Sequence, residues 1–527
     1  MRRRTLTPGP GPAGVRRARS RHQLQQEGGP VPSNVTRIED LADAHVGVVG
    51  MGRTGRAVLE ALSTLGARVS VYDERQEALE DLPAPVASAC AGSPGRLAQA
   101  LTEQRPRLLV VSPGVPATGP VLAAAAACGI ETWSEVELAW RLQRASARPD
   151  VPWVAVTGTD GKTTTVGMIS SVLGAAGMRA PAVGNIGAPV VTTVLEGGAD
   201  VLAVELSSFQ LHTTRTLSPL AAACLNLAPD HLDWHGGYEG YRADKARVYA
   251  RTRRGAVYNC ADEATCLMVR EADVMEGCRA VGFTLEAPAL GQVGVVDDLL
   301  VDRAWHPGRH TEGLEVATLA DLAHLAPGGQ ASRLPAHVLA DALAAAALAL
   351  AVGVPGRAVS AGLRAFAPGA HRLVTVAQGG GVTWVDDSKA TNPHSASAAL
   401  SALEPGTGVW IVGGDTKGAQ FHDLVRQVAV RLRAAVVIGA DQTEVLDALA
   451  RQAPQVPVRR VPHGGPREVV DGAVAAAAAL ARPGDTVMLA PACASWDQFS
   501  SYAQRGDLFA AAARDHVRRG TTDQERD

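Results

Sequence analysis

The chain contains 527 residues, of which 46% are hydrophobic and 20% are charged, and its formal net charge is −3. At about 150 residues per domain, this length predicts roughly three domains rather than a single core. The near-neutral charge argues against a general attraction to nucleic acid or to an anionic membrane, so any polyanionic ligand must be bound by a local site.

Cysteine usage and hydropathy indicate the cellular compartment in which the protein is expected. The seven cysteines are scattered and form no C-x-x-C pair, which favours a reducing cytoplasm over a disulfide framework or a zinc cluster. The apolar runs are short and rich in alanine, so we interpret them as buried helices and expect no transmembrane span. We therefore expect a cytoplasmic protein that has no nucleic-acid partner and does not insert into a membrane.

Residues 1–38 differ in composition from the rest of the chain. The segment is rich in Arg, Pro and Gly, and it contains no acidic residue before Glu27. A secretory signal needs an apolar stretch after its basic residues, and this segment has none. We predict a disordered basic tail here; its composition would also fit a transit peptide or a start assigned too far upstream.

A pattern of alternating strands and helices opens the first predicted domain, residues 39–141. Short β runs at 45–50, 68–73 and 107–114 are separated by helical stretches such as 55–67. Repeated β-α-β units predict a parallel sheet that helices cover on both faces. The sequence thus predicts a Rossmann-like domain at this end of the chain.

The stretch "GMGRTG" follows the first of these strands. Its glycines are Gly50, Gly52 and Gly55, and Asp73 lies about 20 residues further on, which matches the dinucleotide fingerprint. An NAD site would place Asp73 on a ribose hydroxyl, whereas a UDP-type site would place Asp73 and Arg75 around another nucleotide. A tight turn without a ligand is the third interpretation. Of these we favour a nucleotide diphosphate.

A second β-α pattern begins after the Pro-bearing connector 146–152 and defines the predicted central domain, residues 142–368. Further strands are expected at 200–206 and 220–227, and an Ala-rich helix at 336–353. The stretch 281–330 is less regular and contains short β-like pieces. We interpret it as a small accessory sheet or a surface insertion, without a function.

The motif "TGTDGKTTT", residues 157–165, stands between a predicted strand and a predicted helix. Backbone N–H groups at such a helix start bind phosphate oxygens, Lys162 supplies a positive charge, and the Thr163 hydroxyl can hold Mg²⁺. Val156 replaces the first glycine of the usual spacing. The context still predicts a phosphate-binding loop.

Polar residues follow the neighbouring strands of the same block. They are Glu205, Asp230, His231, Asp233 and Lys245. Because the carboxyl ends of parallel strands meet at one edge of a sheet, we expect these side chains to converge beside the phosphate loop. Carboxylate and imidazole groups near a bound triphosphate are suitable Mg²⁺ ligands.

A third α/β block is predicted over residues 369–518, followed by a polar tail at 519–527. Its strands are expected at 381–387, 408–414, 434–440 and 485–491. Polar loops follow these strands, including "DDSKATNP", "VGGDTKGAQF" and "PACASWDQFSSYAQRG".

Lysine is scarce: of the 50 basic residues only four are lysine, and each of the four lies in one of the motifs above. A chain that uses arginine on its surface is expected to keep lysine where a compact ammonium or a primary amine is required. The four are Lys162, Lys245, Lys389 and Lys417.

Taken in this order, the motifs resemble those of the Mur ligase family over about residues 40–517. The resemblance is carried by "GMGRTG", "TGTDGKTT", "GNIG", "ELSSFQL", "DHLD", "YRADKARVY", "HRL", "DDSKATN", "GGDTKG" and "PACASWDQF". The last motif is the most specific, since it is similar to the branch of the family that adds D-glutamate.

This resemblance implies an α/β fold of three domains: an N-terminal Rossmann-like domain that binds UDP, a central P-loop ATPase-type domain and a C-terminal Rossmann-like domain that binds the amino acid. It implies a monomeric, ATP-dependent ligase that joins D-glutamate to UDP-N-acetylmuramoyl-L-alanine through an acyl phosphate, in peptidoglycan synthesis and hence in cell-wall biogenesis, cell shape and cell division. Another amino-acid-adding Mur ligase or a folylpolyglutamate synthase-like ligase is the alternative.

The resemblance also implies the site residues. Those expected to bind ATP are Gly158, Thr159, Asp160, Gly161, Lys162, Thr163, Thr164, Arg372 and Asp387. Those expected to bind the UDP substrate are Thr54, Asp73, Arg75, Ser112, Gly114, Asn185 and His231, and those for D-glutamate are Lys389, Thr391, Lys417, Ser495 and Tyr502. The implied catalytic residues are Lys162, Glu205, His231 and Lys245. Two Mg²⁺ ions would be held by Thr163, Glu205, His231 and Lys245, the lysine being carbamylated by CO₂.

The chain departs from the family pattern at two places. Val338 and Asp341 stand where the family usually carries asparagines that contact adenine, and Asp160 stands in the phosphate loop where asparagine is common. Two other classes of function also fit parts of the sequence. A nicotinamide dehydrogenase would use "GMGRTG" alone, and a non-catalytic nucleotide switch would turn over ATP without stimulation by D-glutamate.

Overall fold

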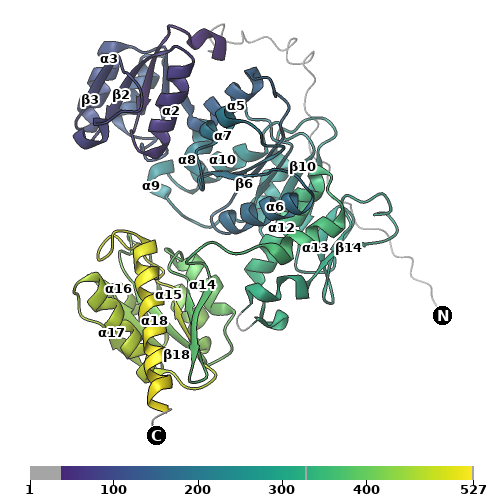
Figure 1. Ribbon diagram of the computed structural model, residues 1–527, viewed down its shortest axis with the longest axis vertical. Helices are drawn as coiled ribbons and strands as arrows, with labels where there is room; N and C mark the ends of the chain where they lie inside the picture. The colour runs from purple at the N-terminus through teal and green to yellow at the C-terminus, as the bar shows by residue number, and fades with distance from the viewer. Residues whose placement is uncertain (1–36, 327–328, 525–527) are drawn as a thin grey trace, which may run out of the picture. The chain divides into compact units, whose positions relative to one another are not determined.

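The computed structural model describes residues 37–326 and 329–524 (Figure 1). The predicted basic tail therefore lies outside the described residues up to position 36. The described chain forms two compact units. The first unit runs to Thr318 and includes Ala340–Ala365, and the second comprises Leu319–Leu339 and the residues from Phe366 onward.

A five-stranded parallel sheet begins the first unit, with the strand order β3-β2-β1-β4-β5. Its strands are β1 (His45–Val49), β2 (Arg68–Asp73), β3 (Ser88–Ala91), β4 (Leu108–Val111) and β5 (Glu131–Ser134). Its helices are α2 (Arg53–Thr64), α3 (Pro94–Gln104), α4 (Pro120–Ala127) and α5 (Glu135–Ala145). The predicted parallel sheet is confirmed, and its strand order reverses between β1 and β4, where ligands of such sheets bind.

Alternation along the strands explains why helices cover both faces of this sheet. Val46 and Val48 of β1 belong to the cluster that includes α2 and α5, whereas Val49 packs with α3 and α4. Successive strand residues point to opposite faces, so a nearly continuous apolar strand serves two cores. In Figure 1, α2 and α3 lie on opposite sides of β2.

A nine-stranded sheet forms the rest of the first unit, in the order β14-β13-β12-β11-β10-β9-β6-β8-β7. Its strands are β6 (Trp153–Thr157), β7 (Ala182–Gly184), β8 (Leu202–Glu205), β9 (Ala221–Cys224), β10 (Gly255–Asn259), β11 (Arg279–Phe283), β12 (Gln292–Val296), β13 (Leu299–Asp302) and β14 (Leu314–Thr318). The strands from β7 to β12 pair in parallel, whereas β13 and β14 are antiparallel.

The irregular stretch 281–330 extends this sheet. Val296 pairs with Leu299, so β12 and β13 are joined by the two residues Asp297 and Asp298. Asp297 has a φ of 54°, as tight two-residue hairpins require. The expected accessory sheet is therefore an antiparallel edge of the main sheet.

Helices cover the nine-stranded sheet and position its phosphate loop. They are α6 (Lys162–Ala175), α7 (Val190–Glu196), α8 (Ser208–His212), α9 (Leu232–His235), α10 (Tyr238–Ala246), α11 (Glu263–Glu271), α12 (Ala336–Val352) and α13 (Gly356–Ala365). Gly362 of α13 approaches α6 so closely that an added Cβ would lie 2.3 Å from the Cα of Val172. The Ser171 hydroxyl also donates to the Gly362 carbonyl at 2.7 Å, so α13 braces the helix that follows the phosphate loop.

The second unit contains a six-stranded sheet in the order β15-β16-β20-β17-β18-β19, parallel except for β15. Its strands are β15 (Val374–Gly379), β16 (Val382–Asp386), β17 (Gly408–Gly413), β18 (Leu432–Ile438), β19 (Val458–Arg460) and β20 (Thr486–Leu489). Its α-helices are α14 (Pro393–Ser401), α15 (His422–Val428), α16 (Thr443–Gln452), α17 (Pro466–Leu480) and α18 (Tyr502–Gln524). The order reverses between β20 and β17, which places the loops after these strands at the expected ligand edge.

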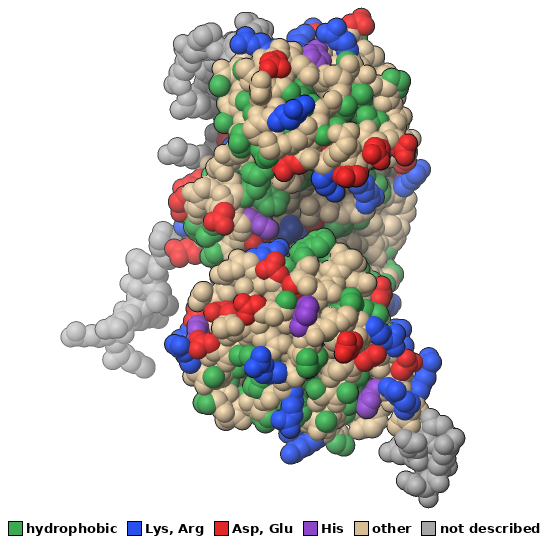
Figure 2. Space-filling view, turned by 90° about the vertical axis from the view of Figure 1, so that its left-hand side faces the viewer, with side chains coloured by type: hydrophobic (Ala, Val, Ile, Leu, Met, Phe, Trp, Pro, Cys, Tyr) green, Lys and Arg blue, Asp and Glu red, His purple; other side chains and the backbone are tan. Residues whose placement is uncertain are grey.

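Short 3₁₀ turns complete the described chain: η1 (Ile38–Leu41), η2 (Gln76–Leu79), η3 (Arg247–Tyr249), η4 (Leu319–Leu325), η6 (Ala331–Arg333) and η7 (Ala429–Arg431). No helix among the described residues is long and apolar enough to cross a membrane. All seven cysteines are free thiols. On the face shown in Figure 2, acidic and basic side chains are interspersed rather than gathered into one patch, in keeping with the small net charge.

Candidate functional site

The phosphate loop joins β6 to α6 and is held by the neighbouring strand end. The backbone N–H groups of Thr159 and Asp160 both donate to Oδ1 of Asn226, at 3.0 and 2.9 Å. Gly161 is the N-cap of α6 with a φ of 81°, and an added Cβ there would lie 2.2 Å from Oδ1 of Asp341. The glycine is therefore required by its backbone conformation and by the close approach of α12.

Lys162 folds back onto this loop. Its Nζ donates to the backbone carbonyls of Gly158 and Thr159, both at 2.8 Å. These acceptors are neutral, so a phosphate oxygen would be a stronger partner for the ammonium group.

Glu205 at the end of β8 links two other candidate residues. The Thr163 hydroxyl donates to Glu205 Oε2 and the Asn185 side-chain amide donates to Oε1, each at 2.8 Å. Only 1% of Glu205 is exposed. A hydroxyl and a carboxylate beside a phosphate loop are hard oxygen donors of the kind that Mg²⁺ prefers.

Lys245 of α10 lies beneath the same loop. It is 2% exposed, its Nζ donates to the Gly158 carbonyl at 2.7 Å, and it sits 4.7 Å from the centre of the Tyr241 ring. No described acidic side chain forms an ion pair with it. Burial, and next the charge of Lys162, lower the pKa of Lys245 to about 7.

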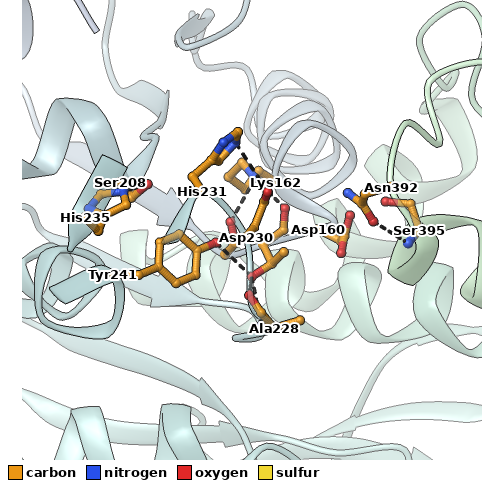
Figure 3. Close-up of polar contacts among 12 residues, drawn as sticks. Asp160, Lys162, Ser208, Ala228, Asp230, His231, His235, Tyr241, Asn392 and Ser395 are labelled. Atoms are coloured by element: carbon orange, nitrogen blue, oxygen red, sulfur yellow. Dashed lines mark hydrogen bonds and ion pairs between the residues drawn. The ribbon is translucent and has the colours of Figure 1, made fainter. Parts of the chain in front are cut away.

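Tyr241 was not among the predicted site residues. Its hydroxyl shares a hydrogen bond of 3.0 Å with the Thr159 hydroxyl, which also contacts the backbone of Ala228 (Figure 3). Tyr241 precedes Lys245 by one helical turn, so its helical spacing from that lysine was the available signal.

His231 and its neighbours are more exposed than Glu205 and Lys245. His231 caps α9 with a φ of 50°, and its Nε2 lies 3.4 Å from Oδ2 of Asp230. Figure 3 shows this pair beside Lys162. Asp233 is exposed and forms no hydrogen bond or ion pair with another described residue. The structure thus brings Lys162, Thr163 and Glu205 together, but not Asp233.

The candidate metal set needs donors beyond the usual side chains. Within residues 37–326 and 329–524, no group of three or more His, Cys, Asp or Glu residues is arranged to hold a metal ion. Thr163 and Glu205 fit Mg²⁺ as an oxygen pair, 2.8 Å apart. Lys245 becomes an oxygen donor only as a carbamate, and its buried amine without an acidic partner suits that modification.

A cavity of about 450 Å³ lies at the β1/β4 end of the five-stranded sheet. The lining includes all of the residues predicted for the UDP group in this domain, namely Thr54, Asp73, Arg75, Ser112 and Gly114. Arg53, at the first turn of α2, supplies a further positive charge, and Leu97, Val115 and Val121 supply an apolar wall. The cavity suits a ligand with an apolar ring and an anionic group.

Two of these residues also shape the cavity. Asp73 accepts from the backbone N–H groups of Met51 and Arg75, at 2.7 and 2.9 Å. The Ser112 hydroxyl donates to the Gly50 carbonyl at 2.7 Å. Both side chains therefore hold the glycine-rich turn in place.

In the second unit, Arg505 joins two of the predicted loops. It is fully buried and donates to the hydroxyl and carbonyl of Ser388 and to the carbonyl of Cys493. Sequence reasoning missed it, because an arginine in "YAQRG" does not differ from the many surface arginines. Burial lowers the pKa of Arg505 to about 10.

Several predicted residues of this unit gather around those loops. Nζ of Lys389 lies 3.9 Å from the centre of the Tyr502 ring. The backbones of Asp415 and Ala494 exchange hydrogen bonds of 3.0 and 2.8 Å, which brings the loop of Lys417 beside that of Ser495. Asp387 accepts from the Leu373 backbone at 3.3 Å. Arg372 and Thr391 form no hydrogen bond or ion pair with described residues and are not tied into this network.

Comparisons with known proteins cover most of the chain. Residues 44–134 match the family model "Mur ligase MurD-like, N-terminal domain", 156–318 match "Mur ligase middle domain", and 371–493 match "Mur ligase, glutamate ligase domain".

Three relatives that this chain matches over nearly their whole length carry the name UDP-N-acetylmuramoylalanine--D-glutamate ligase. The relative from Streptomyces coelicolor is 49% identical over 90% of this chain and 99% of its own. The relative from Thermobifida fusca is 48% identical over 90% and 99%, and the one from Mycolicibacterium smegmatis is 45% identical over 89% and 96%.

Solved structures support the fold. A crystal structure of MurF from Acinetobacter baumannii superposes with a TM-score of 0.50 at 18% identity, covering 93% of this chain and 98% of that one. Folylpolyglutamate synthase from Mycobacterium tuberculosis, complexed with ADP and AMPPCP, gives 0.50 at 18% identity over 73% and 95%.

Proposed function

Because the chain belongs to the Mur ligase family, we propose that it is the ATP-dependent ligase that joins D-glutamate to UDP-N-acetylmuramoyl-L-alanine in peptidoglycan precursor synthesis. The observation that carries this proposal is the identity of 45–49% to relatives of that name over about nine-tenths of the chain. It favours D-glutamate over the amino acids of other Mur ligases and over a folylpolyglutamate synthase, whose likeness is limited to the fold.

The reaction transfers the γ-phosphoryl group of ATP to the alanyl carboxylate, with ADP as the leaving group. The amine of D-glutamate then attacks the acyl phosphate carbon, a C–N bond forms, and phosphate leaves with its electron pair while the amine loses a proton. Lys162 would exchange its two loop carbonyls for phosphate oxygens and so neutralise the transferred group. The remaining catalysis is largely the positioning of three reactants.

Mg²⁺ would be held first by Thr163 and Glu205, whose oxygens already lie 2.8 Å apart. Bound there, it would supply positive charge to the phosphoryl oxygens. His231 and the carbamate of Lys245 would complete a second Mg²⁺ site. The carbamate forms when the neutral amine adds to CO₂ and releases a proton, so a lysine with a lowered pKa and no acidic partner is suited to it.

The UDP group would occupy the 450 Å³ cavity, with Thr54, Arg75 and Gly114 facing the nucleotide and with Asp73 and Ser112 shaping the turn that receives it. Asn185 and His231 would lie toward the muramoyl-alanine end.

In the second unit, Arg372 and Asp387 would face ATP. The proposed D-glutamate residues are Lys389, Thr391, Lys417, Ser495 and Tyr502, which follow the strands of the six-stranded sheet. Their cationic and hydroxyl groups suit a dicarboxylate. We propose that the enzyme acts as a monomer in the cytoplasm.

Phosphate release from ATP tests this function. We expect release only when UDP-N-acetylmuramoyl-L-alanine and D-glutamate are both present. Turnover of ATP that neither substrate stimulates would support a nucleotide switch instead, and a change in NADH absorbance with a 2-hydroxy acid would support a dehydrogenase.

A further inference from the structure

Three side chains near the phosphate loop form one continuous hydrogen-bonded chain. Nε2 of His235 lies 2.9 Å from the Ser208 hydroxyl, and Nδ1 of His235 lies 2.7 Å from Oδ2 of Asp244. Figure 3 shows the first of these pairs, with Tyr241 next to it. None of the three residues has a role in the function proposed above.

The hydrogen-bonded chain Ser208–His235–Asp244 is enclosed by protein. The His235 side chain has no exposed surface, and Ser208 and Asp244 are 3% and 5% exposed. The ring of Phe209 stacks on the His235 ring at 5.5 Å with an interplanar angle of 4°. The three groups are thus desolvated, which makes their mutual hydrogen bonds costly to break.

The hydrogen bonds have a definite direction. Because a carboxylate only accepts, Nδ1–H of His235 donates to Asp244. When that proton is on Nδ1, Nε2 of the neutral ring is an acceptor and receives a hydrogen bond from the Ser208 hydroxyl. Replacing any of the three with a side chain that lacks the required donor or acceptor would interrupt the hydrogen-bonded chain.

Each member of the chain stands close in sequence to a proposed metal-binding residue. Ser208 begins α8, three residues after Glu205. His235 ends α9, whose N-cap is His231, and its backbone N–H donates to the His231 carbonyl at 3.4 Å. Asp244 directly precedes Lys245 in α10.

We infer that the chain Ser208–His235–Asp244 is a positioning network that holds three separate segments, and with them Glu205, His231 and Lys245, in register for divalent metal. The inference rests on the metal site of the proposed function. The helix α8 follows β8, whereas α9 and α10 both follow β9, so the metal-binding residues come from the ends of two strands. Outer partners that align such residues tune metal affinity.

His212 supplies a matched control. Its Nδ1 lies 2.9 Å from the same Asp244 carboxylate, but its side chain is 33% exposed and it does not continue to Ser208. His212 ends α8, so its loss removes a direct contact between α8 and α10 but leaves the links from α8 through α9 to α10 intact. The two histidines therefore separate the link that passes through α9, the helix capped by His231, from the direct contact of α8 with α10.

The test is Mn²⁺ binding to the full-length protein. Electron paramagnetic resonance measures this binding in bicarbonate buffer with ADP. Ser208→Ala and His235→Asn both cut the link between α8 and α9, while the asparagine can still donate to Asp244. We expect each to weaken Mn²⁺ binding about 10- to 100-fold. The double variant should be no weaker than the poorer single one, since both remove the same link. His212→Gln should leave Mn²⁺ affinity unchanged.

Thermal unfolding shows whether each variant is folded, and Ser208→Ala, which removes one oxygen atom, keeps the test valid if His235→Asn is unstable. Wild-type affinity in the Ser208 and His235 variants would overturn the inference and leave the ligase assignment untouched, as would equal losses in the His212 variant. Absence of bound Mn²⁺ from the wild type would overturn both this inference and the proposed metal ligands. The phosphate-release assay would then decide separately whether the ligase assignment holds.

Discussion

Lys162 and Lys245 donate to the same oxygen atom, the backbone carbonyl of Gly158, at 2.8 and 2.7 Å. Two ammonium groups that share one neutral acceptor repel each other, and the charge of Lys162 contributes to the lowered pKa of Lys245. In the proposed function, the repulsion between the two ammonium groups is relieved in two ways. A triphosphate would attract Lys162 away from the carbonyl, and CO₂ would turn Lys245 from a cation into a carboxylate.

Lys245→Arg is expected to abolish activity, because a guanidinium stays protonated and cannot form a carbamate. Lys245→Ala should be inactive but partly rescued by short carboxylates such as acetate or formate, measured as phosphate release. Arg247→Lys, two residues further on and half-exposed, is the control and should keep activity. A Lys245→Arg enzyme with wild-type turnover would contradict the carbamate.

Asp341→Asn is expected to lower the KM for ATP several-fold. Its carboxylate lies against Gly161 of the phosphate loop, where a negative charge opposes the binding of a triphosphate, and asparagine keeps its shape and an acceptor oxygen. Steady-state kinetics with varied ATP provide the measurement, and the KM for D-glutamate should not change. A raised KM for ATP would mean that the carboxylate itself supports nucleotide binding.

Arg505→Lys should raise the KM for D-glutamate at least several-fold and leave the KM for the UDP substrate unchanged. The guanidinium bridges the loops of Ser388 and Cys493 through three acceptors, and a single ammonium cannot reproduce that fork. Arg514→Lys, on the exposed side of α18, is the matched control. Equal changes in both KM values would point to general destabilisation rather than to a loop that serves the amino acid.

Glu135 gives the first unit a pH-dependent stability. Burial raises the pKa of its carboxyl from 4.5 to about 7, although Oε1 accepts from the Val191 backbone. The native state therefore binds more protons than the unfolded state between these pH values, and the free energy of unfolding falls as pH rises through this window.

Glu135→Gln keeps the acceptor and removes the titration, so it should flatten this slope and stabilise the protein at pH 8 by at most about 3 kcal/mol. Urea unfolding at pH 5, 6, 7 and 8 gives the comparison, with the exposed Glu196→Gln as control. Parallel slopes for the wild type and Glu135→Gln would exclude Glu135 as the titrating group.

The fold was largely predictable because its strands are short apolar runs followed by glycine-rich or polar turns. The strands β1, β2 and β4 follow this pattern, and the helix α12 was predictable from the Ala-rich run at 336–353. The short strands β3 and β5 escaped prediction because "SACA" and "ETWS" lack an apolar run and form only by pairing with β2 and β4. Such strands are set by tertiary contacts rather than by local preference.

The candidate site also contains residues that the sequence predicted and residues that it did not. Lys162, Thr163 and Glu205 were predictable because they stand in recognisable motifs: Lys162 and Thr163 begin the helix after β6, and Glu205 ends β8. Arg505 and Tyr241 were not, because their partners are Ser388 and Thr159, more than 80 residues away in the chain. Sequence periodicity reports which face a residue occupies and carries no information on such distant partners.

The proposed function requires that this ligase selects D-glutamate over other amino acids. The most direct measurement is the incorporation of radiolabelled amino acids into UDP-N-acetylmuramoyl-L-alanine in the presence of ATP, with D-glutamate, L-glutamate, L-lysine and meso-diaminopimelate compared at equal concentration. We expect a labelled product with D-glutamate alone. Incorporation of L-lysine or meso-diaminopimelate at the same rate would contradict it.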